Sequence, residues 1–188
     1  MAGAAIERLT GGTWEAAMGR RIFEPLGMAS AGFGAPLGDN AWGHRAPPFI
    51  GAVVAPTPMD PTDPAAENPL ALGPAGKVHA SLADYGKFLR LFLTEGGGLL
   101  KPETMARLTR PVGEGGAPYA LGWAIAPPMP WTRGPSLVHD GSNTMWHMLA
   151  VVAPERGMAV VTVCNTGPHA ARMAAPLLAQ RLQKAYAP

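Results

Sequence analysis

The sequence predicts an α+β fold in which an antiparallel sheet is covered by a helix. Two apolar runs, residues 147–153 and 158–164, flank the turn-forming sequence Pro154-Glu-Arg-Gly157, a pattern typical of a β-hairpin. Strand-like patterns at 119–126 and 136–139 precede the hairpin, and a helical pattern at 169–185 follows it. Four strands followed by a helix favour an antiparallel sheet with helical cover.

The N-terminal part predicts two short helices. Residues 3–10 end at Gly11-Gly12, a common helix stop. Thr13 is placed to cap a second helix that ends near Pro25 and Gly27. Its apolar residues recur at intervals of four and form a helical stripe: Trp14, Met18, Ile22 and Leu26.

The middle of the chain predicts a long connection and the clearest helix. Residues 34–74 are rich in Gly, Pro, Asp and Asn and indicate an ordered connection with short strand pieces, such as residues 50–54. Ser81-Leu-Ala-Asp84 is a capping sequence, and Gly96-Gly97-Gly98 ends the helix that follows. Its expected apolar face is Leu82, Tyr85, Phe88, Leu89 and Phe92. A short helix follows between Pro102 and Pro111.

A terminal helix over residues 169–185 is expected to cover the sheet. With it, residues 1–188 form a single partial domain. The large apolar residues of this helix share one side, which we expect to face the sheet: Met173, Leu177, Leu178 and Leu182. Residues 1–115 form the helical, loop-rich portion of this domain, and residues 116–188 form the antiparallel sheet and terminal helix.

Composition excludes several classes of partner. The net charge is +2, only 15% of residues are charged and no Lys/Arg run is present, so a nucleic-acid partner is not expected. No apolar run approaches the roughly 18 residues of a membrane span. No signal peptide is recognisable, so the chain as written is expected to stay in the cytoplasm. Cys164 has no histidine beside it in sequence and is expected to be a small buried apolar residue.

The familiar cofactor motifs are absent from the sequence. The five histidines form neither HExxH nor a zinc-finger spacing, so no metal is expected. GxxxxGK[ST], GxGxxG and GxSxG are also missing. We therefore expect no cofactor.

The sequence HDGSN, residues 139–143, has features of a catalytic strand end. A strand delivers His139, Gly141 permits close approach of another backbone, and the following N–H groups are suited to an oxyanion. Taken alone, His-x-Gly is a weak motif that a polar turn with a surface histidine explains better.

Several other stretches occur with HDGSN in a recognisable order. AIERLTGGTWEAAMGRRIFEPLGMASAGFG is followed by LGPAGKVHASLADYGKFLRLFL, LLKPETMARLTRP, YALGWAI and SLVHDGSN. Together they resemble the C-terminal part of the serine β-lactamase-like family, which includes class C β-lactamases, D-Ala-D-Ala peptidases and related esterases. The resemblance implies the C-terminal part of the β-lactamase/transpeptidase-like fold, with part of its helical subdomain.

The resemblance implies a site built from three motifs. S-x-x-K provides the acylated serine, Y-x-N a tyrosine base, and K-T-G or H-x-G a strand that faces the serine. His139-Asp140-Gly141 matches the third motif, and the resemblance makes the Ser142 backbone N–H one of two oxyanion donors. Asp140, Asn143, Trp146 and Trp42 are the candidate substrate-binding residues. The alternative for Asn143 and Trp146 is packing in the hairpin, and packing is the favoured role for Trp42.

The first two motifs have no counterpart here. None of the four serines is followed three residues later by lysine, and no tyrosine begins Y-x-N. The chain thus resembles a family member cut after its second motif, and it is expected to be inactive alone. The parent's partner would be a small ester or amide substrate. The absent N-terminal half would leave apolar surface along a sheet edge, open to that half or to self-association.

Three interpretations remain open at this point. The chain is a fragment of a serine hydrolase, a non-catalytic pseudoenzyme that binds ligands, or an unrelated α+β binding domain. For a parent enzyme, the substrate could be a β-lactam, a D-alanyl peptide or an ester. Histidine in place of the lysine of K-T-G favours esterase or peptidase activity, because the fixed positive charge for a β-lactam carboxylate is lost. Such a parent could be periplasmic or secreted.

Overall fold

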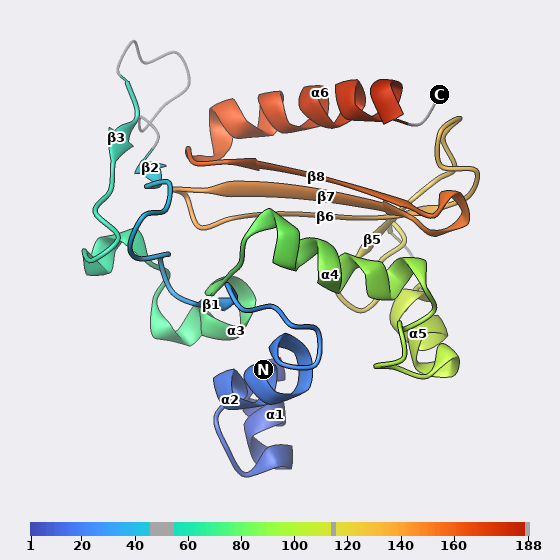
Figure 1. Cartoon of the computed structure of the whole chain (residues 1–188), viewed down its shortest axis with the longest axis horizontal. Helices are drawn as coiled ribbons and strands as arrows, with labels where there is room; N and C mark the ends of the chain where they lie inside the picture. Colours follow the sequence, from blue (N-terminus) through green and yellow to red (C-terminus); the bar gives the residue numbers. More distant parts are fainter. Residues whose placement is uncertain (46–54, 114–115, 187–188) are drawn as a thin grey trace. The chain divides into compact units, whose positions relative to one another are not determined.

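The computed structural model describes residues 1–45, 55–113 and 116–186 (Figure 1). These residues form two compact units that interleave along the chain. The first unit comprises Met1–Phe88, Ser142–Trp146 and Asn165–Pro168, and the second comprises Leu89–Gly141, His147–Cys164 and His169–Pro188.

Both N-terminal helix boundaries are confirmed. Helix α1 (Ala2–Thr10) ends at Gly11, which adopts the left-handed conformation with φ of 67° and donates its N–H to the Glu7 carbonyl. Helix α2 (Trp14–Met18) begins after Thr13, whose side-chain oxygen accepts a hydrogen bond from the Ala16 N–H at 3.1 Å. A glycine stop and a threonine cap therefore set these ends, as local sequence predicts.

In the predicted stripe of the second helix, Trp14 is buried, whereas Met18, Ile22 and Leu26 are half-buried. A π-helical turn, Gly19–Phe23, follows α2 directly and carries Phe23 into the buried position, while Ile22 is only half-buried. A π turn holds more residues per turn than an α-helix, so it rotates everything after it. Phe33 packs against both Trp14 and Phe23, with ring centroids 4.8 Å and 5.6 Å apart.

The long connection contains two small antiparallel pairs and several helical turns. Strand β1 (Gly32–Phe33) pairs with β4 (Val78–His79), and β2 (His44–Arg45) pairs with β3 (Thr57–Pro58). The turns are η2 (Pro64–Ala66), η3 (Leu70–Leu72) and α3 (Gly73–Gly76). The expected strand piece at residues 50–54 lies outside the described residues.

Helices α4 (Leu82–Leu93) and α5 (Pro102–Thr109) match the predicted helices. The Ser81 hydroxyl accepts a hydrogen bond from the Asp84 N–H at 3.2 Å, which confirms the predicted cap. Leu89 is fully buried, but Leu82 is exposed because it stands in the first turn of the helix, at its N-terminal end.

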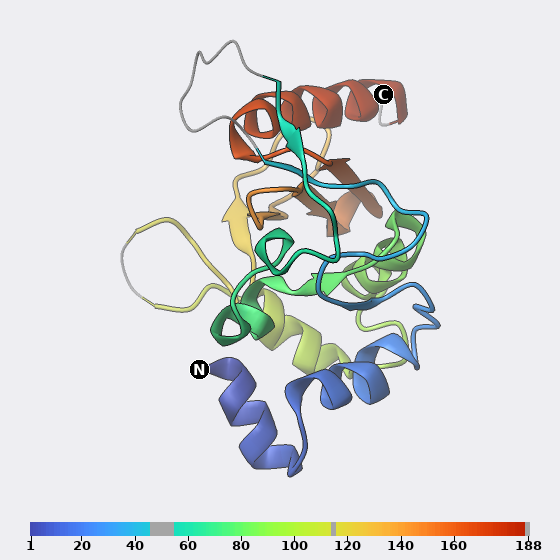
Figure 2. The same cartoon turned by 90° about the vertical axis from the view of Figure 1, so that its left-hand side faces the viewer.

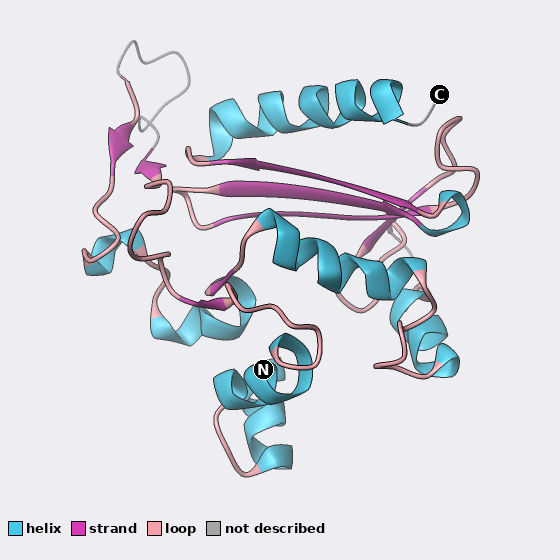
Figure 3. Cartoon of the chain, in the orientation of Figure 1, coloured by secondary structure: helices cyan, strands magenta, loops and turns pink. Residues whose placement is uncertain are grey.

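The second unit contains a four-stranded sheet in the order β5-β6-β7-β8 (Figure 3). The strands are β5 (Ala124–Ala126), β6 (Ser136–Ser142), β7 (His147–Ala153) and β8 (Met158–Cys164). β7 and β8 pair antiparallel from His147↔Cys164 to Ala153↔Met158, so the predicted hairpin is confirmed at the predicted residues. β5 is shorter than predicted, because Gly122 has a φ of 97° and interrupts the extended run.

Helix α6 (Pro168–Tyr186) lies along one side of the sheet (Figures 1 and 2), but with a different face inward from the one predicted. Its buried residues are small and four apart: Ala171, Ala175 and Ala179. The Thr162 hydroxyl of β8 donates to the Ala175 carbonyl at 3.4 Å, so the helix backbone approaches the strand closely. Three of the four residues of the expected stripe are exposed instead, at 73% for Met173, 60% for Leu177 and 45% for Leu178, while Leu182 is half-buried. Alanine allows this close approach, whereas leucine would hold the helix away.

Candidate functional site

His139 lies near the end of β6 and is braced by aromatic rings of the second unit. Its imidazole meets the Trp123 ring edge-to-face, with centroids 6.1 Å apart and planes at 88°. Trp123 in turn meets Phe92 edge-to-face at 5.1 Å. Such ring pairs restrict side-chain rotation, so the half-buried His139 ring is held in a defined direction.

Asp140 follows His139 on β6, and successive residues of a strand face opposite sides of the sheet. Its Oδ2 atom is 3.4 Å from Nε2 of His147, whose side chain is 3% exposed, against 54% for Asp140. Cys164 of β8 is the direct cross-strand partner of His147. Sequence reasoning missed this arrangement, since a histidine does lie beside Cys164 in the fold although none lies beside it in the sequence.

Gly141 and Ser142 close β6 next to open space. A Cβ atom placed at Gly141 would meet no other heavy atom within 4 Å among the residues described. The side of Gly141 on which a side chain would stand is therefore open in the described part of the chain, and the expected role of this glycine stays a prediction. The Ser142 hydroxyl donates to the Trp146 carbonyl at 2.6 Å and accepts from the Thr144 N–H at 3.0 Å. The oxyanion role of the Ser142 backbone N–H stays a prediction.

Asn143 organises the turn that follows β6. Its side-chain oxygen accepts hydrogen bonds from the N–H groups of Met145 at 3.2 Å and Trp146 at 3.0 Å. Thr144 has a φ of 77°, a left-handed conformation that an Asn-anchored turn supports. The side-chain oxygen of Asn143 is thus engaged in folding the turn.

The turn packs against residues 41–44 from the long connection, all within the first unit. The Trp146 indole N–H donates to the Ala41 carbonyl at 3.1 Å, and the His44 N–H donates to the Met145 carbonyl at 3.1 Å. At Gly43, a Cβ atom would lie 2.7 Å from Met145 Cβ and 2.8 Å from the Trp146 ring. Only glycine fits this contact without a shift of its neighbours.

Asn165 also makes hydrogen bonds to residues 41–44. Its side-chain amide donates to the Trp42 carbonyl at 3.0 Å, and its backbone carbonyl lies 2.8 Å from Nδ1 of His44, which must therefore carry the hydrogen. The Gly167 N–H donates to the His44 carbonyl at 3.0 Å. The fold thus brings Trp42, Asn143 and Trp146 into one hydrogen-bonded region, with the Trp42 side chain 44% exposed. Asn165 was not singled out from the sequence, where a lone asparagine after a strand carries no distinguishing signal.

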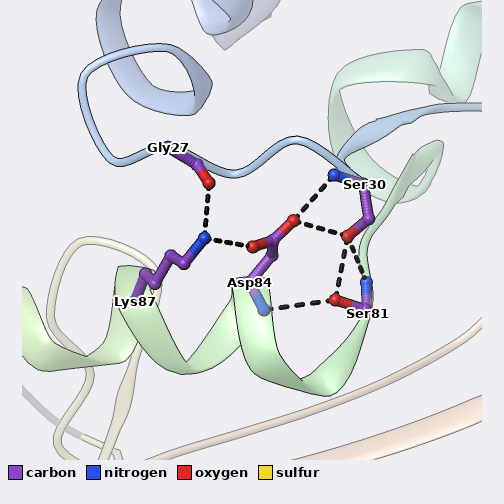
Figure 4. A network of polar contacts seen from close by, with 5 residues as sticks. All are labelled: Gly27, Ser30, Ser81, Asp84 and Lys87. Atoms are coloured by element: carbon purple, nitrogen blue, oxygen red, sulfur yellow. Dashed lines mark hydrogen bonds and ion pairs between the residues drawn. The ribbon is translucent and has the colours of Figure 1, made fainter.

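A separate polar network joins the N-terminus of α4 to the turn after the π-helix (Figure 4). The Asp84 carboxylate accepts hydrogen bonds from the Ser30 N–H at 2.7 Å, the Ser30 hydroxyl at 2.6 Å and the Lys87 ammonium at 2.6 Å. Lys87 also donates to the Gly27 carbonyl. The bonds from Lys87 and then Ser30 lower the pKa of Asp84 from 3.8 to about 2. Three hydrogen bonds thus hold the carboxylate in place, as expected of a structural group.

The described part of the chain lacks two features that would indicate other kinds of site. No group of three or more His, Cys, Asp or Glu side chains there is arranged to hold a metal ion. None of its helices combines the length and apolar character needed to cross a membrane.

Comparison with known proteins identifies the family. The sequence matches the family described as beta-lactamase over residues 1–183, so the chain belongs to the beta-lactamase family. No curated protein matches the sequence.

Solved structures of similar fold support that assignment. An octameric penicillin-binding protein homologue from Pyrococcus abyssi superposes with a TM-score of 0.72 at 24% identity, covering 96% of this chain and 40% of the other. A D-stereospecific amidohydrolase from Streptomyces gives 0.68 at 21% identity, covering 88% and 48%. A beta-lactamase/D-alanine carboxypeptidase from Pseudomonas syringae gives 0.68 at 18% identity, covering 99% and 57%. The β-lactamase/transpeptidase-like fold is thereby confirmed, and the chain spans only 40 to 57% of the length of these three structures.

Proposed function

We propose that the end of β6 supplies one wall of a serine-hydrolase site that transfers an acyl group from an ester or amide. The observation that carries this proposal is His139-Asp140-Gly141 at the end of a strand in a beta-lactamase family chain. The His139 ring, held by Trp123, would donate a hydrogen bond to the reacting groups. The Ser142 N–H would stabilise the oxyanion in the open space beside Gly141.

The acylated serine and its activating lysine would come from polypeptide outside residues 1–188. None of the four serines has a lysine three residues later. Two of them are also engaged elsewhere, since Ser30 donates to Asp84 and Ser142 donates to the Trp146 carbonyl. Without a nucleophile the acyl-enzyme cannot form, so residues 1–188 would be inactive alone.

The proposed substrate class is an ester or a D-configured amide. A histidine lacks the fixed charge with which a lysine would bind the β-lactam carboxylate, so this site would not favour β-lactams. The exposed Trp42 side chain is the strongest candidate for substrate contact in the first unit. Asp140 is half-exposed, but its carboxylate is directed toward His147, so a substrate contact there would compete with that pair.

The first experiment tests the missing nucleophile. Purified residues 1–188 would be incubated with p-nitrophenyl acetate, nitrocefin or a fluorophosphonate and examined by intact-protein mass spectrometry. We expect no burst of product and no stoichiometric adduct. A stable acyl group on any serine would contradict the proposal.

The second experiment tests the roles of His139 and Trp42 in a longer protein that includes an upstream S-x-x-K segment. His139→Ala is expected to lower kcat/KM by about 100-fold or more, mainly through kcat. Trp42→Ala should raise KM with little effect on kcat. Gln180→Ala on the exposed side of α6 is the control and should leave both constants unchanged. An active enzyme with unchanged constants in His139→Ala would exclude the proposed role.

A further inference from the structure

Trp123 lies across the sheet from His139 because of the pairing of their strands. β5 pairs antiparallel with β6, with Ala124 opposite Val138. The same register, extended by one residue, places Trp123 opposite His139, and side chains of opposite residues lie on one face of a sheet. The edge-to-face contact of the two rings, with centroids 6.1 Å apart, agrees with this register. The position of Trp123 beside His139 is therefore a consequence of strand pairing.

The Trp123 ring is itself fixed by packing. It is 5% exposed, and Phe92 of α4 meets it with ring centroids 5.1 Å apart and planes at 70°. Protein interiors are close-packed, so a buried ring with such a neighbour has few other rotamers available. Trp123 thus presents a rigid surface to His139.

The backbone of Trp123 belongs to a tight turn that is bound to α5. The Ala120 N–H donates to the Trp123 carbonyl at 2.7 Å, and the Gly122 N–H donates to the Ala120 carbonyl at 2.9 Å. Gly122 has a φ of 97°, which glycine adopts more readily than any other residue. The Leu121 N–H donates to the Leu108 carbonyl of α5 at 3.3 Å. Backbone hydrogen bonds and ring packing therefore hold Trp123 together.

We propose that Trp123 is a positioning residue for acyl transfer and sets the direction in which His139 presents its ring nitrogens. The inference rests on the proposed function, because it requires His139 to face the reacting groups. Hydrogen bonds in catalysis need heavy atoms about 2.6–3.2 Å apart, and a displacement of about 1 Å can lower the rate about 100-fold. Without the Trp123 ring, the His139 side chain would populate other rotamers, and few of them would place a ring nitrogen correctly.

Kinetics of the longer protein with an upstream S-x-x-K segment test this role. Trp123→Leu keeps an apolar side chain but removes the ring, whereas Trp123→Phe keeps a ring. Trp123→Leu is expected to lower kcat at least about tenfold and to change KM less than about twofold. Trp123→Phe should keep kcat within about threefold of the unmodified protein, because a ring still faces His139. Equal losses in both variants, or no loss in Trp123→Leu, would overturn the proposal.

A double-mutant cycle shows whether the effect passes through His139. His139→Ala removes the positioned ring, so adding Trp123→Leu should lower kcat less than about twofold further. A full additional loss would overturn the proposal, because Trp123 would then act on the site by another route.

The same variants separate this inference from the proposed function. An active protein that His139→Ala leaves unchanged would overturn both. A large loss in His139→Ala with none in Trp123→Leu would overturn only the role of Trp123 and would leave the proposed function standing.

Trp14→Leu is the matched control for the loss of a buried tryptophan ring. Trp14 is 7% exposed and meets Phe33 edge-to-face at 4.8 Å within the first unit. This variant should lower the Tm but leave kcat unchanged at a temperature where the protein stays folded. A loss of kcat equal to that in Trp123→Leu would show a general effect of destabilisation and would overturn the proposal.

Nuclear magnetic resonance of the longer protein with ¹³C-labelled histidine gives a direct readout of the His139 ring. Its ring-proton resonances are assigned by their absence in His139→Ala. They should move in Trp123→Leu, because the ring current of the indole is lost, and should stay in place in Trp14→Leu. Unmoved His139 resonances in Trp123→Leu would overturn the proposal.

Discussion

Asp140 and His147 meet across neighbouring strands, with the carboxylate Oδ2 3.4 Å from the imidazole Nε2. His147 is almost completely buried, and neither ring nitrogen has a hydrogen-bond partner in the described structure. The contact becomes an ion pair only when the ring is protonated. The polar His147 ring is thus buried near the end of the sheet that carries the His-x-Gly sequence. Burial without hydrogen bonds costs folding free energy.

Replacing His147 by leucine should therefore be tolerated. His147→Leu is expected to change the free energy of unfolding by between zero and about 1 kcal/mol in the stabilising direction, because an unsatisfied polar group is replaced by an apolar one. Urea unfolding would measure this. Asp140→Asn is the paired variant and should change stability by less than about 1 kcal/mol, since the carboxylate is half-exposed. A loss above about 2 kcal/mol in His147→Leu would mean that the contact stabilises the fold.

The lowered pKa of Asp84 predicts that the protein loses stability in acid. The pKa of this carboxyl is lowered in the folded state to about 2, from an ordinary value of 3.8. The carboxylate therefore contributes stability that is present above about pH 4 and is lost as the pH falls toward 2. Asp84→Asn should lower the Tm at neutral pH and flatten its fall between pH 4 and 2, as measured by circular dichroism. Asp39→Asn removes the same charge from an exposed loop and should keep the steep fall.

The inward face of α6 can be tested by exchanging residue sizes. Ala175→Leu is expected to destabilise the protein by about 1–3 kcal/mol, because the Ala175 backbone contacts Thr162 and leaves no room for a larger side chain. Leu177→Ala should change stability by no more than about 0.5 kcal/mol, because Leu177 is exposed. Denaturant unfolding would measure the loss of stability in both variants. A larger loss in Leu177→Ala than in Ala175→Leu would show that the leucine side of α6 is the buried one.

Gly43 should be intolerant of a side chain. Gly43→Ala is expected to destabilise the first unit by about 1–3 kcal/mol, because the new Cβ would overlap Met145 and Trp146. The tryptophan emission spectrum, to which Trp146 contributes, would report the local change alongside the unfolding curve. Gly86→Ala in α4 is the matched control: it meets no neighbouring atom, and it should stabilise the helix by about 0.5–1 kcal/mol. Equal stability of the two variants would show that the Gly43 contact is looser than described.

Local sequence signals predicted much of the fold, because the forces involved act over a few residues. The Thr13 and Ser81 caps, the Gly11 stop and the β7–β8 hairpin all depend on groups within four residues of each other, or on turn residues between them. The family could also be predicted, because its motifs recur in order along the whole chain.

Contacts between distant segments could not be predicted in the same way. Periodicity placed large apolar residues on the inner face of α6, whereas close packing on β8 selected the alanines, including Ala175. The π turn at Gly19–Phe23 broke a regular spacing of four that the sequence shows clearly. The pairing of Asp140 with His147 depends on strand order, and the role of Asn165 depends on a segment more than a hundred residues earlier.

The hydrogen bonds around residues 41–44 carry a consequence for the order of folding. They join residues separated by 105, 121 and 123 positions. The bonds of Ala41, Trp42 and His44 therefore cannot form until Trp146 and Asn165 are in place. Contacts between such distant residues are slow to form, because a long loop must close first. During synthesis, the helices near the N-terminus can form early, while the region around Trp42 takes its final shape only after β7 and β8 have left the ribosome.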